Sequence, residues 1–344
     1  MKNFNLENLV RPNILKLKPY SSARDEYKGS TGVFLDANEN PFGNLNRYPD
    51  PYQKEVKEKL STLKSIPVSQ IFLGNGSDEV IDLVFRIFCT PGRDKALVFT
   101  PTYGMYEVSA NINDTELLQL PLNSDFQIDK ESILPFLKDE NLKLIFICSP
   151  NNPTGNSIEN VDFILEKFNG IVFVDEAYID FSTQKSWAEK LSQYPNLIIS
   201  QTFSKARGLA AVRVGIAYSS PEIIALFNKT KPPYNVSQLN QEAALIALLD
   251  DKRYQSEIKT IFGEKERLEK ELLQLSVIKK IYPSDANFIL VEVNDADGIY
   301  NNLVQQKIIT RNRNSVIAGC IRITIGTTEE NNQLIAALKA YKNS

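Results

Sequence analysis

Short, almost wholly apolar runs recur at intervals along the first two thirds of the chain. They lie at residues 95–99, 142–148, 171–174, 197–200 and 214–218. Apolar runs of this length without polar alternation are typical of strands covered on both faces, as in a parallel sheet. The stretches between and before them show helical periodicity, at residues 53–63, 78–89, 161–168 and 187–194. This alternation of strands and helices predicts an α/β domain over residues 37–248.

The pattern differs on both sides of this domain. Residues 1–36 are irregular and broken by prolines, which predicts an N-terminal arm that ends in a short strand at 32–36. A helical pattern runs from about residue 238 to 275, with an interruption near Asp250 and Asp251. Predicted strands and helices then alternate, at residues 287–293, 296–307, 321–325 and 329–342. Residues 249–344 are therefore predicted to form a smaller α+β domain.

The composition of the chain gives no indication that it binds nucleic acid or a membrane. The chain has 344 residues, a formal net charge of −3 and scattered Lys and Arg residues, which gives no indication of nucleic-acid binding. No apolar run is long enough to span a membrane, and the N-terminus lacks an apolar leader. Cys89, Cys148 and Cys320 lie far apart in apolar surroundings, which is typical of free thiols in a reducing compartment. We expect a cytoplasmic protein that binds neither nucleic acid nor membrane.

The chain contains no histidine. This excludes Ser-His and Cys-His nucleophile pairs, and without a closely spaced cysteine pair there is no basis for a zinc site. No metal site is predicted. Acid–base chemistry must come from Lys, Tyr, Asp, Glu or a cofactor.

Lys205 is the leading candidate for such chemistry. It follows the apolar run at 197–200, with Ser204 before it and Arg213 eight positions after it. An amine that is buried and near another cation loses its charge easily and becomes a nucleophile toward a carbonyl. A solvated surface lysine is the alternative interpretation. Three further segments, each after another apolar run, favour the chemical role.

The first segment, Gly-Asn-Gly-Ser-Asp-Glu at 74–79, follows the apolar residues 71–73 and opens a predicted helix. Free N–H groups and the helix dipole favour a phosphate at such a place, although an ordinary helix cap has the same pattern. The second segment, Ser-Pro-Asn-Asn-Pro-Thr-Gly at 149–155, carries Asn152. It lies at the carboxyl edge of the predicted sheet, where open α/β sheets bind ligands, and a purely structural turn is the alternative.

The third segment, Val-Asp-Glu-Ala-Tyr at 174–178, places Asp175 at the end of an apolar run. A carboxylate there is costly unless it meets a cation or a metal. Together the segments supply a phosphate cradle, an acid for a pyridine nitrogen, an amide and a tyrosine for a ring hydroxyl, and a Schiff-base lysine. These are the requirements of pyridoxal 5′-phosphate, which is the predicted cofactor.

The order and spacing of these segments resemble those of fold-type I pyridoxal-phosphate-dependent aminotransferases, and most closely the histidinol-phosphate aminotransferase family. The likeness covers essentially the whole chain, and it includes the segments at 19–24, 35–41, 47–50 and 319–326. The central segments are shared across the superfamily and indicate the cofactor. The terminal segments are narrower, and they alone indicate the substrate.

The resemblance implies a fold and a reaction. The fold is a large α/β domain on a mainly parallel seven-stranded sheet between helices, with a smaller α+β domain after it. The reaction is transamination between histidinol phosphate or imidazole acetol phosphate and 2-oxoglutarate or glutamate, in histidine biosynthesis. The resemblance also implies a homodimer with shared active sites.

The resemblance further implies a role for each matching position. Lys205 carries the Schiff base and shuttles a proton, and Asp175 pairs with the pyridinium nitrogen. Arg322 binds the substrate carboxylate, and Tyr20 and Arg311 lie near the substrate's phosphate. Tyr48 reaches the cofactor phosphate from the other subunit. The remaining positions that contact the cofactor are Ser77, Asp78, Tyr103, Asn152, Tyr178, Ser204 and Arg213.

Two positions depart from the family pattern. Arg207 replaces an apolar residue near the site, so its side chain is expected to turn to solvent or to find an acid. Arg313 follows Arg311 closely, so either arginine can be the one that faces the substrate.

Two other functions stay open from the sequence. Aromatic and other amino acid aminotransferases and threonine-phosphate decarboxylases share the fold, the cofactor, the lysine, the Asn, the Asp and both arginines. A cofactor-binding regulatory module without turnover is the other alternative. The arm before residue 37 is too short and too interrupted by proline for the helix-turn-helix extension that would support it.

Overall fold

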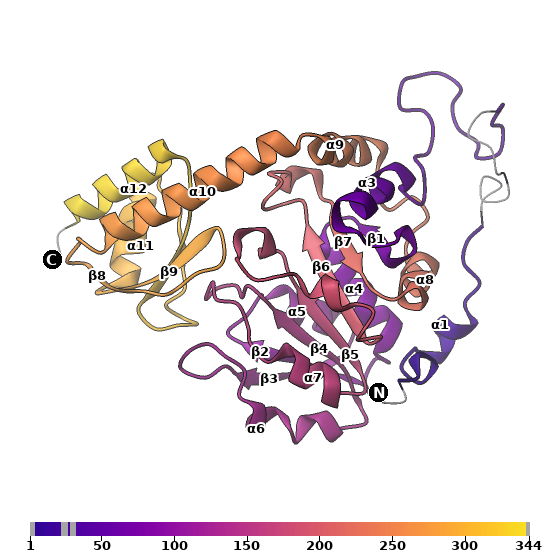
Figure 1. Ribbon diagram of the computed structural model, residues 1–344, viewed down its shortest axis with the longest axis horizontal. Helices are drawn as coiled ribbons and strands as arrows, with labels where there is room; N and C mark the ends of the chain where they lie inside the picture. Colours follow the sequence, from indigo (N-terminus) through magenta and orange to yellow (C-terminus); the bar gives the residue numbers. More distant parts are fainter. Residues whose placement is uncertain (1–3, 22–26, 28–31, 342–344) are drawn as a thin grey trace.

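The computed structural model describes residues 4–21, 27 and 32–341, which form a large layered body joined to a smaller one (Figure 1). The large body is built on a seven-stranded sheet with strand order β1-β7-β6-β5-β4-β2-β3, in which only β7 runs antiparallel to its neighbours. The predicted α/β fold with a mainly parallel sheet is confirmed. The strands are β1 (Ile71–Gly74), β2 (Lys95–Thr100), β3 (Glu116–Pro121), β4 (Leu142–Cys148), β5 (Ile171–Asp175), β6 (Leu197–Thr202) and β7 (Gly215–Tyr218).

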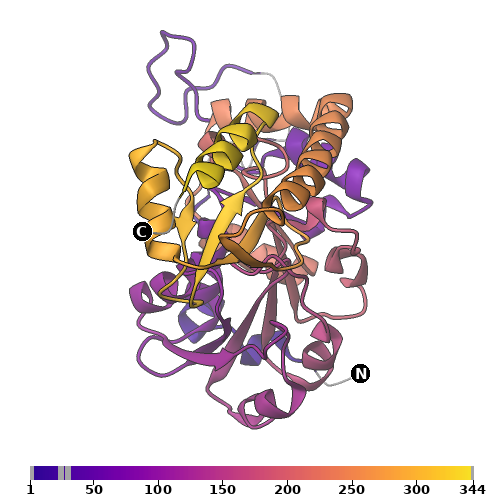
Figure 2. The same ribbon diagram turned by 90° about the vertical axis from the view of Figure 1, so that its left-hand side faces the viewer.

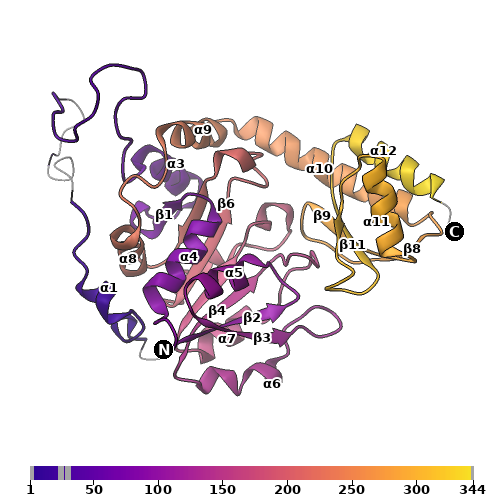
Figure 3. The same cartoon turned by 180° about the vertical axis from the view of Figure 1, so that it is seen from behind.

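Helices cover both faces of this sheet. One face carries α4 (Ser77–Phe88), α5 (Met105–Ile112) and α8 (Pro221–Thr230), and α4 and α5 lie in front of the strands in Figure 3. The other face carries α3 (Lys54–Lys64), α6 (Lys130–Ile133), α7 (Val161–Lys167) and α9 (Gln238–Leu249). Successive strand residues alternate between the two cores, so Phe146 packs beside α4 while Ile145 and Ile147 pack on the opposite face. Burial on both faces explains why the apolar runs show no alternation.

Two elements of the large body differ from the sequence prediction. Strand β3 was not predicted, because it is an edge strand whose residues are all at least partly exposed and therefore form no apolar run. The helix predicted at 187–194 is wrong in extent, since only a 3-10 turn forms at Trp187–Lys190. Other short 3-10 turns lie at Leu6–Asn8, Val68–Gln70, Phe136–Lys138, Ile179–Phe181 and Ala210–Val212.

The N-terminal segment contains a short helix, α1 (Pro12–Lys16), but the strand predicted at 32–36 is wrong. Val33 and Leu35 are each 88% exposed and pair with no strand among the described residues. Their alternation fits a strand, yet neither sheet of the described residues pairs with them. The segment before α3 instead forms an open loop that projects from the body in Figures 1 and 2.

The smaller body packs three helices on one four-stranded antiparallel sheet of order β10-β11-β9-β8. Helix α10 (Asp251–Leu272) leads into it from the large body, and the small body stands in front in Figure 2. No helix of the described residues is long and apolar enough to cross a membrane. The other elements of this body are β8 (Ile278–Ile281), β9 (Phe288–Val293), α11 (Ala296–Gln305), β10 (Arg311–Asn312), β11 (Cys320–Thr324) and α12 (Thr328–Ala340).

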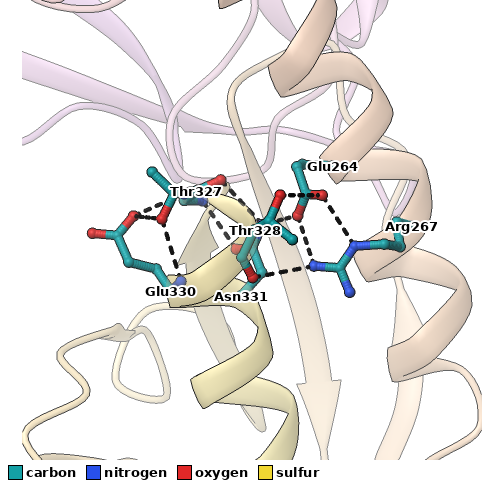
Figure 4. Close-up of polar contacts among 7 residues, drawn as sticks. Glu264, Arg267, Thr327, Thr328, Glu330 and Asn331 are labelled. Carbon is teal, nitrogen blue, oxygen red and sulfur yellow. Dashed lines mark hydrogen bonds and ion pairs between the residues drawn. The ribbon is translucent and has the colours of Figure 1, made fainter.

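A buried acid connects α10 to the segment after β11 (Figure 4). Glu264 accepts hydrogen bonds from Arg267 at 2.7 Å, from the Thr328 hydroxyl at 2.9 Å and from the Asn331 amide at 2.7 Å. The Arg267 bond and the other donors lower the pKa of Glu264 to about 2, so the acid is ionised at neutral pH. The network fixes the end of β11, the strand that carries Arg322.

Candidate active site

The carboxyl ends of β4, β5 and β6 meet the first turn of α4 and strand β11 around a cavity of about 240 Å³. Residues from both bodies therefore converge on one place. Cys148, Ala177, Thr202 and Ala210 form part of the lining. The rest of the lining consists of ten of the thirteen site residues predicted from the sequence, namely Ser77, Asp78, Tyr103, Asn152, Asp175, Tyr178, Ser204, Lys205, Arg213 and Arg322.

Asp175 ends β5 and is only 3% exposed. Its Oδ2 accepts a hydrogen bond from the Tyr106 hydroxyl at 2.8 Å, and its Oδ1 accepts one from the backbone N–H of Ala177 at 3.1 Å. Burial raises the pKa of Asp175 to about 6. No Lys or Arg among the described residues forms an ion pair with it. A buried carboxylate in this state favours a positively charged partner, which a ligand can supply.

Lys205 lies in the turn after β6 and is accessible from the cavity. Its amine is 5.7 Å from the centre of the Tyr178 ring. The turn is held by a hydrogen bond from the Ser204 N–H to the Thr202 hydroxyl at 3.1 Å. Partial burial and the positive charge of Arg322 lower the pKa of Lys205. An amine with a lowered pKa is neutral more often and is therefore a better nucleophile.

Arg322 of β11 reaches from the small body to the loop after β4. It donates a hydrogen bond to Oδ1 of Asn152, and its guanidinium lies 5.1 Å from the centre of the Phe288 ring. Phe288 in turn meets the Tyr178 ring edge-on, with 5.1 Å between the centroids. Burial lowers the pKa of Arg322, and no carboxylate of the described residues pairs with it. The guanidinium is therefore available to an anionic group of a ligand.

The first turn of α4 provides an anion site. No side chain caps this helix, and Gly76 before it has φ +80°. A Cβ on Gly76 would lie 2.6 Å from Nη2 of Arg213, so only glycine allows the guanidinium to approach. Arg213 donates to Asp78 at 3.1 Å and to the Ser204 hydroxyl at 3.5 Å. Free helix amides, a hydroxyl and a guanidinium at one place suit a phosphate.

Three predicted site residues lie outside this cavity. Tyr48 stacks on Tyr234 with 4.4 Å between ring centroids, beside a second cavity of about 450 Å³. Tyr20 is 71% exposed and lines neither of these cavities. Arg311 lies directly opposite Arg322 in the β10–β11 register, which places both side chains on the same face of the small sheet.

Two supporting residues were missed at the sequence level. Tyr106 on α5 is fully buried, bonds to Asp175 and meets the ring of Tyr103 edge-on at 5.7 Å. Its position three residues after Tyr103 is the one signal that could have indicated it. Asn151 donates to the Pro101 carbonyl at 2.9 Å and thereby joins the loops after β4 and β2. The sequence indicates a role for the neighbouring Asn152 and none for Asn151.

The sequence predicts that Arg207 turns to solvent or finds an acid, and this prediction is wrong. Its guanidinium lies 3.6 Å from the centre of the Tyr254 ring and donates to the Ala247 carbonyl at 3.2 Å. Tyr254 belongs to α10 and Ala247 to α9. Stacking and one carbonyl bond satisfy the planar cation without a carboxylate. Arg207 is thus used to pack the helices beside the site.

Comparisons with known proteins show the family and the fold. The sequence profile of aminotransferases of class I and II matches residues 24–338. The histidinol-phosphate aminotransferase of Christiangramia forsetii is 53% identical over 350 residues, which covers 100% of both chains. The solved histidinol-phosphate aminotransferase from Clostridium acetobutylicum has a TM-score of 0.78 at 25% identity, covering 86% of this chain and 90% of that one. The one from Sinorhizobium meliloti, solved in complex with pyridoxal-5′-phosphate, has a TM-score of 0.77 at 24% identity, covering 88% of each chain.

Replacement of Asp175 by Asn is expected to stabilise the cofactor-free protein. Because the folded-state pKa of Asp175 is raised from 3.8 to about 6, the native state holds an extra proton between these values and loses stability as the pH rises through them. At pH 8, Asp175→Asn removes a cost of up to about 3 kcal/mol, and its urea unfolding midpoint lies above that of the wild type. The difference vanishes near pH 4.

Asp78→Asn is the matched control, because this carboxylate is paired with Arg213 and its loss gives no such gain. If the wild type and Asp175→Asn have the same urea unfolding midpoint at pH 8, the carboxylate of Asp175 is not a destabilising unpaired charge.

Proposed function

This chain belongs to the class I and II aminotransferase family, and we propose that it transfers an amino group between histidinol phosphate or imidazole acetol phosphate and 2-oxoglutarate or glutamate. The step belongs to histidine biosynthesis, and the cofactor is pyridoxal 5′-phosphate. One observation carries the chemistry: an accessible lysine, a buried carboxylate without a cation and an uncapped helix N-terminus share one cavity. The full-length likeness to curated relatives supports the choice of substrate.

The cavity fits this cofactor at both ends. Asp175 offers an unpaired negative charge to a protonated pyridine nitrogen. The N–H groups of Ser77 and Asp78, together with Ser204 and Arg213, hold the phosphate.

The middle of the cavity fits the ring of the cofactor. Tyr103, Asn152 and Tyr178 all line the cavity, and in this proposal Tyr103 stacks on the ring while the Asn152 amide and the Tyr178 hydroxyl bind the ring oxygen. Burial raises the pKa of Tyr178, so its hydroxyl keeps its proton and donates it as a hydrogen bond. Tyr103, Asn152 and Tyr178 thus orient the ring, while Asp175 keeps its nitrogen protonated.

When bound, the cofactor acts as an electron sink for the electrons of the bond broken at the substrate Cα. With the cofactor bound, the Lys205 amine would be the attachment point for its aldehyde. The same ε-amine, when free, would act as the base that carries the proton from the substrate Cα to the cofactor. The lowered pKa of Lys205 keeps this amine neutral for part of the time, as a base requires. Catalytic roles thus fall to Lys205, Asp175 and Tyr178.

Arginines of the small body select the anionic groups of the substrates. Arg322 lines the cavity and suits a planar, two-pronged contact with a carboxylate or phosphate. Arg311 lies across from it in the register, and Arg313 is half-buried near both. The two neighbouring guanidinium groups and burial lower the pKa of Arg313. Tyr20 completes the phosphate contacts in our assignment.

The active enzyme is a homodimer in this proposal. Tyr48 lies outside the Lys205 cavity of its own chain, on the loop before α3. A second copy related by a two-fold axis can receive this loop, so that Tyr48 reaches the phosphate of the other subunit. Val33 and Leu35, on the same projecting segment, supply apolar surface for such a contact.

The cytoplasm is the proposed compartment. Cys89, Cys148 and Cys320 are all free and buried. Free thiols persist where glutathione and thioredoxin keep them reduced.

Glutamate added to the purified holoenzyme is expected to convert the lysine-bound cofactor to its amino form, with loss of one absorbance band and growth of another. Imidazole acetol phosphate should then restore the first band. Lys205→Ala is expected to bind the cofactor without a covalent link and to lose nearly all turnover. Borohydride reduction and peptide mapping identify the attachment site, and an adduct on another lysine contradicts the assignment.

Arginine variants are expected to separate the substrates. Arg322→Lys loses the planar fork and should impair both half-reactions. Arg311→Ala should weaken binding of the phosphorylated substrate by about 1.5–3 kcal/mol, because a charge-assisted hydrogen bond is lost. Binding of glutamate should weaken less. Arg313→Ala is the matched comparison and shows which of the two arginines faces the phosphate. Equal small losses for both substrates in both variants would favour a general amino acid aminotransferase.

Two inactive variants are expected to restore activity when mixed, if the sites are shared. In a heterodimer of Lys205→Ala with Tyr48→Phe, one site combines an intact Lys205 with an intact Tyr48. Activity after exchange of subunits should exceed the sum of the two parents. Lys205→Ala mixed with Asp175→Asn is the control, because neither of its sites is intact. A fully active monomer by light scattering rules out the shared site.

A further inference from the structure

The small body touches the loop after β4 at a point outside the cavity lining. Oδ2 of Asp285 accepts hydrogen bonds from the Ser157 hydroxyl at 2.6 Å and from the Ser157 N–H at 3.2 Å. The Asp285 N–H donates to the Gly155 carbonyl at 2.7 Å. These three bonds join segments of the two bodies that lie far apart in the sequence. We call the set the Ser157–Asp285 clasp.

Gly155 allows the two backbones to approach this closely. Its φ is +87°, and a Cβ at this position would lie 2.6 Å from Oγ and 2.9 Å from Cβ of Ser284. Ser284 cannot easily move aside, because its Oγ donates to the Phe288 carbonyl at 2.5 Å and accepts from the Ala286 N–H at 3.1 Å. The glycine of the 149–155 segment is therefore required by contact with the small body as well as by its own turn.

The clasp lies next to the contacts that place Arg322. The loop that carries Gly155 and Ser157 also carries Asn152, whose Oδ1 accepts the bond from Arg322. The turn that begins at Ser284 ends at Phe288, over which the Arg322 guanidinium lies at 5.1 Å. Both sides of the Arg322 contact are thus continuous with the clasp.

We propose that Ser157 and Asp285 are positioning residues that hold the small body on the loop after β4, and thereby hold Arg322 where it binds the substrate carboxylate. This rests on the proposed function of Arg322. Neither residue lines the cavity, so neither touches cofactor or substrate. A carboxylate that accepts two hydrogen bonds from one residue fixes both distance and orientation, whereas apolar contacts such as Tyr178 with Phe288 fix mainly distance.

The test uses the full-length holoenzyme and the glutamate half-reaction. Asp285→Ala and Ser157→Ala are expected to raise the glutamate concentration for half-maximal rate about tenfold, with the maximal rate changed by less than about threefold. Ser157→Thr keeps the hydroxyl and should restore the wild-type value. Ser182→Ala is the matched control, since the Ser182 hydroxyl lies 3.4 Å from that of Ser157 and does not bond to Asp285.

The double variant Ser157→Ala with Asp285→Ala should raise the glutamate concentration for half-maximal rate no further than the more affected single variant does, because both substitutions remove the same contact. Additive losses, or a loss of thermal stability with unchanged glutamate dependence, overturn the positioning role.

A second measurement separates this proposal from the proposed function. Hydrogen exchange at the backbone N–H groups of residues 157 and 285 should rise at least about tenfold in Asp285→Ala and stay unchanged in Ser182→Ala. Unchanged exchange in Asp285→Ala overturns the clasp, whatever the substrate. A wild-type enzyme that does not react with glutamate refutes the proposed function, and with it the placement of Arg322 for a carboxylate.

Discussion

A carboxylate buried at the end of a central strand must meet a positive charge, and this requirement organises the site. Asp175 loses nearly all contact with water on folding. Desolvation of an unpaired ion costs roughly several kcal/mol if no other interaction compensates it. Hydrogen bonds from Tyr106 and from the Ala177 N–H provide part of the compensation, yet the pKa stays above its ordinary value. The positive end of α4 and the amine of Lys205 surround the same cavity without pairing with Asp175. The fold thus holds an acid that a cationic group of a ligand can pair with.

Glu176, the residue after Asp175, is also a buried acid, but donors of the protein satisfy its carboxylate. Glu176 is 1% exposed and accepts hydrogen bonds from the Ser186 hydroxyl and the Trp187 N–H, both at 2.6 Å, and from Gln201 at 2.9 Å. Burial raises its pKa to about 7, while these donors oppose the rise. Glu176 is satisfied by the protein and anchors the turn after β5. Two adjacent acids therefore divide the work: Glu176 fixes the turn, and Asp175, held by that turn, is left for a ligand.

Local signals in the sequence were sufficient for the centre of the fold and for most of the cavity. Central strands such as β4 are covered on both faces and read as apolar runs, and glycines and prolines mark the turns that carry Asn152 and Lys205. The sequence prediction failed where the structure of a residue depends on elements that are distant in the sequence. Val33 and Leu35 alternate like a strand but have no sheet beside them. Arg207 found an aromatic ring and a carbonyl on two helices that no local pattern connects to it.

The two bodies bring charges of opposite sign to one cavity without letting them neutralise each other. The large body supplies Asp175, and the small body supplies Arg322, with Arg311 across the strand register and Arg313 beside them. No carboxylate of the described residues pairs with these three arginines, and the buried Nε of Arg313 has no hydrogen-bond partner there. Arg322 bonds instead to the neutral amide of Asn152. A ligand that is cationic at one end and anionic at the other satisfies both sets at once. Since the two sets belong to different bodies, the strength of such binding depends on how firmly the bodies are held together.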